Sequence, residues 1–277
     1  MTVHVRVPAT SANLGAGFDV LGLALDLYAD IGVVDGAVPD GARVVDSHHI
    51  ADIAFRRLGG TGELWERSPI PMGRGLGYSG AVRVGGAAAA VVQRDGSLTD
   101  EGRREVFELT TELEHHPDNV AASVYGGLVA AVGTHVVPVP LGFAPAVVVW
   151  VPDAVTTSTD KSRATLADTV SRADAVFNVG RAALFVAACA SGDTAALATA
   201  VEDRLHQPAR LALVPESARA IAAAGEAGAW AAWLSGSGPT VAALCAPEQA
   251  DTVAAALPPT GHVKLLGIAP AGVVEVP

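Results

Sequence analysis

Three glycines within five positions, Gly73, Gly75 and Gly77, constrain the fold of this chain more than any other feature. They follow a short extended run at 68–70 and precede 81–92, a helix pattern built mostly from small residues. Glycine adopts positive φ and lets backbone N–H groups approach an anion closely, and a helix N-terminus carries partial positive charge. A strand, a glycine loop and a helix start in this order predict an anion-binding site. The same pattern is also typical of a glycine turn that lets a small-residue helix pack closely on a sheet.

The loop lacks the Lys-Ser/Thr pair that follows the glycines of a Walker P-loop. The chain holds only two lysines, Lys161 and Lys264, and both lie far from the loop in sequence. A phosphate bound here would therefore contact backbone N–H groups, with Arg74 and Ser79 as the side-chain donors.

Composition and charge argue against several classes of protein. Half of the 277 residues are hydrophobic and 17% are charged, which is typical of a compact globular chain of one large or two modest domains. The net charge of −11 argues against nucleic acid or an anionic membrane surface as a partner. We expect no membrane-spanning helix, because no apolar run reaches the ~18 residues that a span requires.

The N-terminal residues and the cysteines favour a cytoplasmic location. The first residues alternate like a strand and lack the apolar core of a signal peptide. Cys189 and Cys245 each lie in an apolar stretch, so we expect two buried free thiols in a reducing compartment.

The periodicity along the chain favours an α+β fold. Strand and helix patterns alternate without the regular βαβ rhythm of a doubly wound sheet, so each half is expected to hold a mixed or antiparallel sheet backed by helices. Prolines break the pattern near residues 138–146, which predicts a domain boundary there. The predicted strands are 3–7, 20–34 (one or two strands), 128–132, 135–139, 146–151, 230–234, 240–245, 262–268 and 273–276, and the predicted helices are 46–58, 81–92, 99–114, 172–190, 194–205, 215–227 and 247–257.

Two further loops are rich in glycine and polar side chains. Residues 8–19 read Pro-Ala-Thr-Ser-Ala-Asn-Leu-Gly-Ala-Gly-Phe-Asp and carry Asn13 and Asp19 between two strands. Residues 234–240 read Leu-Ser-Gly-Ser-Gly-Pro-Thr and form a tight turn between two apolar strands. Either loop alone is also explained as a structural turn, since glycine, asparagine, aspartate and serine are the usual turn residues.

Charged residues gather in other segments. One helix ends at Glu114 and the next begins at Pro117-Asp118-Asn119, so a carboxylate and a carboxamide at facing helix ends could hold Mg²⁺ and a substrate hydroxyl. Asp118 is equally well explained as a helix cap. Arg163 and Arg210, in the segments 157–163 and 203–210, could clamp a carboxylate, although surface ion pairing is the commoner role of arginine.

Taken together and in this order, the motifs resemble the GHMP kinases, which include galactokinase, homoserine kinase, mevalonate kinase and phosphomevalonate kinase. That family has an N-terminal strand motif, a central Pro-x-x-x-Gly-Leu-Gly-Ser-Ser phosphate loop and a C-terminal Gly-Ser-Gly-Pro turn. The chain departs from the loop pattern at Tyr78, where the family has its first serine, and at Gly80; its region 35–67 is also short for the family. The resemblance covers essentially the whole chain and is closest to the homoserine kinases in the segments 8–19, 116–120, 158–163, 203–210 and 234–240.

The resemblance implies a fold and an activity. The fold would be the two-domain GHMP kinase fold, with an N-terminal ribosomal-protein-S5-like α/β domain that binds ATP at 1–140 and a C-terminal ferredoxin-like α+β domain at 141–277. The activity would be ATP-dependent phosphorylation of L-homoserine to O-phospho-L-homoserine in threonine biosynthesis, with Mg²⁺. The resemblance further implies a cytoplasmic homodimer whose substrate is a small molecule and which binds neither nucleic acid nor membrane.

The resemblance also implies roles for individual residues. Asp19 would take the substrate ammonium group, the two arginines its carboxylate, and Asn119 would orient its hydroxyl. Several GHMP kinases use an aspartate as base where this chain has Thr159, and Asp160 beside it is a further candidate. The implied substrate-binding residues are Asn13, Asp19, Asn119, Arg163 and Arg210; the catalytic residues are Asn119, Glu114 and Thr159; the metal ligands are Glu114 and Ser79; and the ATP-binding residues are Pro71, Met72, Gly73, Arg74, Gly75, Leu76, Gly77, Tyr78, Ser79, Gly80 and Ala81.

Two other functions stay open from the residues. One is a GHMP kinase that acts on a related amino-acid alcohol, and the other is a catalytically silent GHMP-fold protein that binds a small ligand or a partner. Glu114, Asn119 and the arginine pair favour a kinase, because a silent relative would have no use for both halves of the site.

Overall fold

A computed structural model describes residues 3–153 and 162–276. Residues 154–161 are outside that description, and with them Thr159, an implied catalytic residue, and Asp160, the candidate base beside it.

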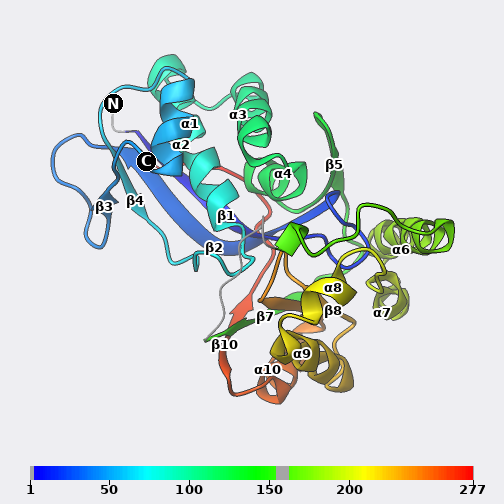
Figure 1. The fold of residues 1–277 in the computed structure, drawn as a ribbon. Helices are drawn as coiled ribbons and strands as arrows, with labels where there is room; N and C mark the ends of the chain where they lie inside the picture. The colour runs from blue at the N-terminus through cyan, green and yellow to red at the C-terminus, as the bar shows by residue number, and fades with distance from the viewer. Residues whose placement is uncertain (1–2, 154–161, 277) are drawn as a thin grey trace.

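The first half of the chain, together with strand β11 near the C-terminus, forms a sheet of seven strands with helices on one face (Figure 1). The strand order is β11-β1-β2-β4-β3, while β5 pairs with β2 and β6, and all of these pairings are antiparallel. The strands are β1 His4–Ala12, β2 Leu21–Val33, β3 Arg43–Val44, β4 Leu64–Arg67, β5 Leu128–Val132, β6 His135–Val139 and β11 Val274–Glu275, and the helices are α1 Ile50–Arg57, α2 Tyr78–Asp95, α3 Asp100–Glu114 and α4 Pro117–Tyr125.

Small residues let α2 lie deep in this half. A Cβ atom on Gly86 would come within 2.0 Å of the carbonyl oxygen of Ala51 in α1, and one on Gly85 within 2.5 Å of the Ile31 side chain in β2. The alanines and valines on either side of these two glycines are buried, so α2 is the central helix of the core. The small-residue pattern thus sets how closely the helix after the glycine loop approaches the sheet.

The second half forms a four-stranded antiparallel sheet in the order β10-β7-β9-β8. Its core lies around the buried Trp150, with α9 and α10 packed against it (Figure 1). The strands are β7 Ala146–Pro152, β8 Ala231–Leu234, β9 Val241–Cys245 and β10 Gly261–Leu266; the helices are α6 Arg172–Ser191, α7 Leu197–Ala200, α8 Gln207–Leu211, α9 Pro215–Glu226 and α10 Ala250–Ala256, with 3₁₀ turns at Thr194–Ala196 and Pro247–Gln249.

The predicted α+β class is confirmed, and most predicted elements lie within a few residues of their predicted bounds. Two predictions were wrong. The extended run at 68–70 is not a strand, because β4 ends at Arg67 and prolines at 69 and 71 cannot donate to a ladder. The helix predicted at 194–205 stops at Ala200, because the Asp203 carboxylate instead accepts the backbone N–H groups of the residues that follow it and turns the chain toward α8.

The boundary at residue 140 remains a proposal. The first sheet reaches Val139 with β6 and the second begins at Ala146 with β7, which fits a boundary between them. The strand β11 near the C-terminus nevertheless belongs to the first sheet, where it pairs with β1. A division by sequence therefore places one strand of the first sheet in the second domain.

Helix α6 differs from what the sequence led us to expect. It has the length and mean hydropathy of a membrane span, by these two criteria alone, and 22% of its most apolar window is buried. Val176 and Val179 lie on its exposed face, at 65% and 70% exposure.

Candidate active site

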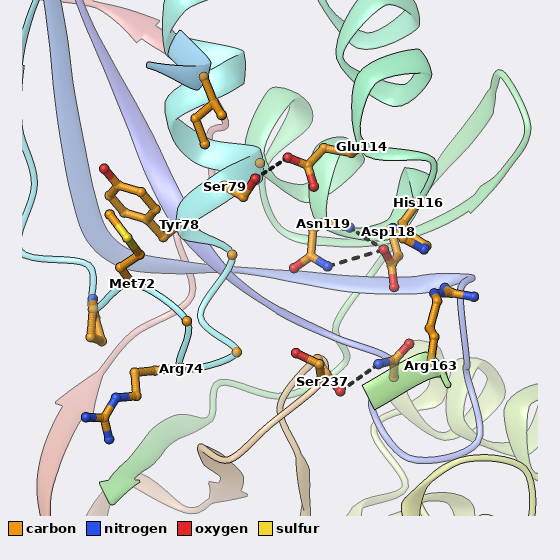
Figure 2. A pocket seen from close by; sticks show the side chains of 18 of the residues that line it. Met72, Arg74, Tyr78, Ser79, Glu114, His116, Asp118, Asn119, Arg163 and Ser237 are labelled. Atoms are coloured by element: carbon orange, nitrogen blue, oxygen red, sulfur yellow. Dashed lines mark hydrogen bonds between the residues drawn. The ribbon is translucent and has the colours of Figure 1, made fainter. Parts of the chain in front are cut away.

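A cavity of about 440 Å³ lies where loops from the two halves meet (Figure 2). Its walls come from the loop after β1, the glycine loop with the first turn of α2, the segment joining α3 to α4, and the turn between β8 and β9. Hydrogen bonds join these walls across the chain: the Asn13 side chain donates to the carbonyl oxygen of Gly236 at 2.9 Å, and the Ser235 hydroxyl donates to that of Gly75 at 2.6 Å. The cavity is therefore shared by both halves of the molecule.

The glycine loop turns the N-terminus of α2 toward this cavity. Gly77 is the N-cap of α2, with a φ of 67° and no side-chain cap. A Cβ atom on Gly77 would lie 1.9 Å from the Thr10 hydroxyl oxygen, and one on Gly75 would lie 2.2 Å from the Ser235 carbonyl oxygen, so both positions require glycine. The first N–H groups of a helix have no partner within it, and here they are available to an anion in the cavity.

Arg74 belongs to this loop, but its guanidinium turns away from the cavity centre (Figure 2). It donates to the carbonyl oxygens of Pro152 and Asp153, at 3.0 Å for Asp153, and so ties the loop to the end of β7. Leu76 and Ala81 are fully buried in the core and do not line the cavity.

Tyr78 also points away from the loop, toward β4. Its hydroxyl donates to the buried carboxylate of Glu66 at 2.8 Å, and Arg43 and His49 contact the other carboxylate oxygen at 2.9 and 3.2 Å. Burial by itself raises the pKa of Glu66, but hydrogen bonds from His49, Tyr78 and Arg43 outweigh it and lower that pKa to about 2. Burial, and then the bond to Glu66, raises the pKa of Tyr78 to about 12. The phenol is therefore a neutral donor to an ionised carboxylate, clear of the loop's N–H groups.

Ser79 and Glu114 meet on the helix side of the cavity. The Ser79 hydroxyl donates to Glu114 Oε1 at 2.5 Å, and Arg83 pairs with the same carboxylate. A carboxylate and a hydroxyl are the hard oxygen donors that Mg²⁺ prefers, and Mg²⁺ usually completes its shell with water and phosphate oxygens. The described residues contain no cluster of three or more His, Cys, Asp or Glu side chains that would hold a metal ion unaided. The pair fits a metal that arrives with a phosphate ligand.

The opposite end of the cavity carries two arginines and a carboxylate. Arg163 Nη2 donates to Asp19 Oδ1 at 2.5 Å, and both guanidinium groups lie over the Phe18 ring, at 5.3 Å for Arg163 and 5.2 Å for Arg210. Within the described residues, the buried Nε atoms of both arginines have no hydrogen-bond partner. Unpartnered cationic donors beside a cavity are suited to an anionic group of a ligand.

Arg210 is 3% exposed and is held in place by its neighbours. Its Nη1 atom donates to the carbonyl oxygen of Gly236 at 3.1 Å and contacts His206, whose backbone N–H donates to Asp203. Burial, and then the nearby Arg163 charge, lowers the pKa of Arg210 from its ordinary value of 12.5. The negative charge of a bound carboxylate would offset both effects.

Asp118 and Asn119 lie between the two ends, in the first turn of α4 (Figure 2). Asn119 is fixed by the Thr10 hydroxyl, which donates to its side-chain oxygen at 2.7 Å. Asp118 is 2% exposed, and its Oδ1 atom accepts the Asn119 backbone N–H at 2.7 Å and the Asn119 side-chain N–H at 3.3 Å. Burial raises the pKa of Asp118 to about 7; the Asn119 backbone N–H opposes this shift and the Asp19 charge adds to it.

Most of the predicted site residues line this one cavity. Thr159 is outside the described residues, and Leu76 and Ala81 line none of the cavity. Sequence reasoning did not assign His48, His49, Ile50, His116 or Ser237, and it explained Asp118 as a cap; only the His-Pro-Asp-Asn and Gly-Ser-Gly-Pro motifs carried a signal for some of them. Those predicted residues that do line the cavity are Asn13, Asp19, Pro71, Met72, Gly73, Arg74, Gly75, Gly77, Tyr78, Ser79, Gly80, Glu114, Asn119, Arg163 and Arg210.

Comparison with known proteins agrees with this architecture. Residues 44–127 match the family model of the GHMP kinases N terminal domain, and residues 185–262 match that of the GHMP kinases C terminal region. The chain is 42% identical to a homoserine kinase of Moorella thermoacetica, over 88% of both chains, and 41% identical to one of Thermus thermophilus, over 96% of both. Its fold is similar to the crystal structure of homoserine kinase from Cytophaga hutchinsonii, with a TM-score of 0.85 and 26% identity over 99% of this chain and 97% of that one.

Proposed function

The chain belongs to the GHMP kinase family, and on that premise we propose that it transfers the γ-phosphoryl group of ATP to the side-chain hydroxyl of L-homoserine. The product is O-phospho-L-homoserine, an intermediate of threonine biosynthesis. The observation that carries the substrate assignment is the pair of buried arginine Nε atoms near Asp19, which have no hydrogen-bond partner among the described residues.

The arginine end of the cavity suits a zwitterion. Arg163 and Arg210 supply donors for a carboxylate, and Asp19 supplies an acceptor for an ammonium group. A neutral sugar would leave these charges without partners, and mevalonate would leave Asp19 unmatched. An amino acid with a side-chain hydroxyl satisfies all three groups.

The glycine loop supports the phosphate end. The N-terminus of α2 offers backbone N–H groups and a positive dipole end to the ATP phosphates. Glu114 and Ser79 would hold Mg²⁺, which neutralises phosphate charge when bound. Arg83, which pairs with Glu114 here, holds that carboxylate near Ser79.

Positioning is the main catalytic contribution of these residues. Phosphoryl transfer passes through a loose transition state that demands little covalent chemistry from the protein. Asn119, fixed by Thr10, orients the acceptor hydroxyl, while the arginines and Asp19 fix the rest of the amino acid. Holding both reactants in one cavity removes much of the entropic barrier to their reaction.

An acceptor panel tests the proposal. ADP release from ATP and Mg²⁺ is measured with L-homoserine, L-serine, L-threonine and mevalonate, and phosphohomoserine is identified in the product. We expect L-homoserine to give the highest kcat/KM. Faster turnover of another amino-acid alcohol would reassign the substrate, and absence of turnover with tight ligand binding would favour a silent member of the family.

Other properties complete the proposal. We propose a division into domains at residues 140 and 141, a cytoplasmic location and a homodimer, with no nucleic acid or membrane as partner. The two cysteines are free and buried, as a reducing compartment allows. The exposed valines of α6 are available for a contact with a second copy. Sedimentation of the purified protein, with Val179→Glu for comparison, tests the dimer.

A further inference from the structure

Three described carboxylates line the cavity, and two of them already have cationic partners. Asp19 pairs with Arg163 at 2.5 Å, and Glu114 pairs with Arg83. Asp118 has no ion pair within the described residues, although it is the most deeply buried of the three. A buried carboxylate without a cation is costly to ionise, so this arrangement requires an explanation beyond stability.

The two oxygens of Asp118 differ in their surroundings. Oδ1 accepts both hydrogen bonds from Asn119, at 2.7 and 3.3 Å. Oδ2 accepts no hydrogen bond from any residue in the described ranges, and Figure 2 shows Asp118 projecting into the cavity between Asn119 and Arg163. One oxygen therefore fixes the carboxylate, and the other is open to whatever occupies the cavity.

Asp118 lies where the acceptor hydroxyl would bind under the proposed function. It adjoins Asn119, which carries the proposed hydroxyl contact, and it lies between the arginine end and the metal pair of Glu114 and Ser79. Asn119 cannot take up a proton at neutral pH, and its side-chain oxygen already accepts from Thr10. Among the described carboxylates that line the cavity, Asp118 is the one that pairs with no cation and can take up this proton.

We propose that Asp118 is the general base of the reaction, an inference that rests on the proposed function. The Asp118 carboxylate accepts the proton of the substrate hydroxyl as the new O–P bond forms. The bond from the γ-phosphorus to the bridging oxygen breaks, and ADP leaves with that electron pair. The protonated acid then returns its proton to solvent when the product leaves.

The charges around Asp118 are consistent with this role. Asp19 from the β1–β2 loop disfavours its ionisation, while Arg163 and Arg210 from the second half favour it. His116, two residues earlier, has its pKa lowered by burial and then by Arg163, so it contributes little charge at neutral pH. Burial dominates and leaves the carboxyl able to gain and lose a proton near neutrality, as a general base must.

Two variants at Asp118 test the proposal against a merely structural role. Asp118→Asn keeps an oxygen for the Asn119 N–H but cannot take a proton, and Asp118→Ala leaves space for a small carboxylate. We expect Asp118→Asn to lower kcat by about a hundredfold or more, with the KM values for both substrates within about threefold. The parent's loss of kcat/KM below about pH 7 should disappear in this variant, and formate should restore part of the kcat of Asp118→Ala.

Other outcomes would overturn the inference. A kcat within about threefold of the parent for Asp118→Asn is too small for a general base. An unchanged acid limb would show that another group titrates, and loss of that limb in Asp160→Asn instead would assign the role to Asp160. The acceptor panel uses the unaltered protein and tests the proposed function separately. Turnover of homoserine can therefore be confirmed even if these variants show that Asp118 is not the base. Circular dichroism of each variant confirms folding.

Discussion

Arg210 is the side chain whose removal should affect the KM for homoserine most and the KM for ATP least. Its guanidinium lines the cavity near Arg163, and its buried Nε atom has no hydrogen-bond partner among the described residues. We expect Arg210→Ala to raise the KM for homoserine by about ten- to a hundredfold, because a charge-assisted hydrogen bond contributes about 1.5–3 kcal/mol. The KM for ATP should change little.

Steady-state kinetics with each substrate varied in turn check this, and Arg163→Ala should behave similarly. Arg204, whose side chain is 51% exposed, provides the matched control as Arg204→Ala. Equal changes in both KM values would place the arginines outside the amino-acid pocket.

Asp118 should also make the stability of the protein depend on pH. Its carboxyl has an ordinary pKa of 3.8, and burial raises this to about 7 in the folded chain. The fold therefore favours the protonated acid: the stabilisation is fully present below about pH 4 and is lost as pH rises through about 7. We expect Asp118→Asn to gain stability over the parent between about pH 5 and about pH 8, by on the order of a few kcal/mol.

Denaturant unfolding of both proteins at the two pH values measures this difference. A constant difference in the free energy of unfolding would mean that Asp118 is already ionised at the lower pH. A gain in stability together with a loss of turnover is the signature of a residue retained for chemistry.

Among the elements, the junction of the glycine loop with α2 is the most sensitive. We expect Gly77→Val to reduce kcat/KM for ATP by ~100-fold or more, since its side chain would collide with Thr10 and strain a positive φ. Gly180→Ala in α6 is the control outside the site, because its Cβ atom would meet nothing within 4 Å. A folded Gly77→Val protein with normal kinetics would contradict the phosphate-loop assignment.

The bond between α2 and β4 should matter more for stability than for turnover. Tyr78→Phe removes one of three partners of the buried Glu66 carboxylate, so we expect a loss of about 1–2 kcal/mol in the free energy of unfolding. Tyr78→Ser should keep activity within about tenfold, or ~1.4 kcal/mol, because the phenol points away from the loop. Thermal unfolding and kinetics of both variants separate the two effects, and a large rise in the KM for ATP would instead place Tyr78 at the nucleotide.

Local pattern sufficed to predict many elements but not the contacts between them. The strands Leu128–Val132 and His135–Val139 were predicted with their observed bounds, because short apolar runs beside glycines are local signals. The glycine loop was likewise visible in sequence. The direction of the Tyr78 side chain was not, because it depends on Glu66 in a strand whose spatial position no local pattern gives.

Asp118 shows the same limit at the site. A residue at the start of a helix normally caps it, and Asp118 does accept the next N–H. Its burial and its open oxygen arise from α4 packing beside β1 and β2, with the Asp118 carbonyl oxygen 2.1 Å from where a Cβ atom on Gly22 would lie. Such contacts join residues distant in sequence, so the motif alone led to the interpretation of Asp118 as a helix cap.

For the molecule as a whole, the segment that leads to β11 joins the last residues to the first sheet. Val273 is fully buried, the Ala269 carbonyl oxygen accepts the N–H of Gly127, and Arg103 donates to the Val273 carbonyl oxygen. We expect Val273→Asp to lower the free energy of unfolding by more than about 3 kcal/mol, because it buries a charge without a partner. Ala271→Asp, at an exposed position, is the control, and equal effects of the two would show that the segment is not held.

The pairing of β11 with β1 also has a consequence for synthesis on the ribosome. Val5 and Arg6 are translated long before their partners Glu275 and Val274, because the other strands of both sheets lie between them in the chain. Until then, one edge of β1 carries unpaired N–H and C=O groups, which are a template for pairing with other nascent chains. The first sheet is therefore completed only after the strands of the second sheet have been translated, and chaperones that shield exposed strand edges should bind before then.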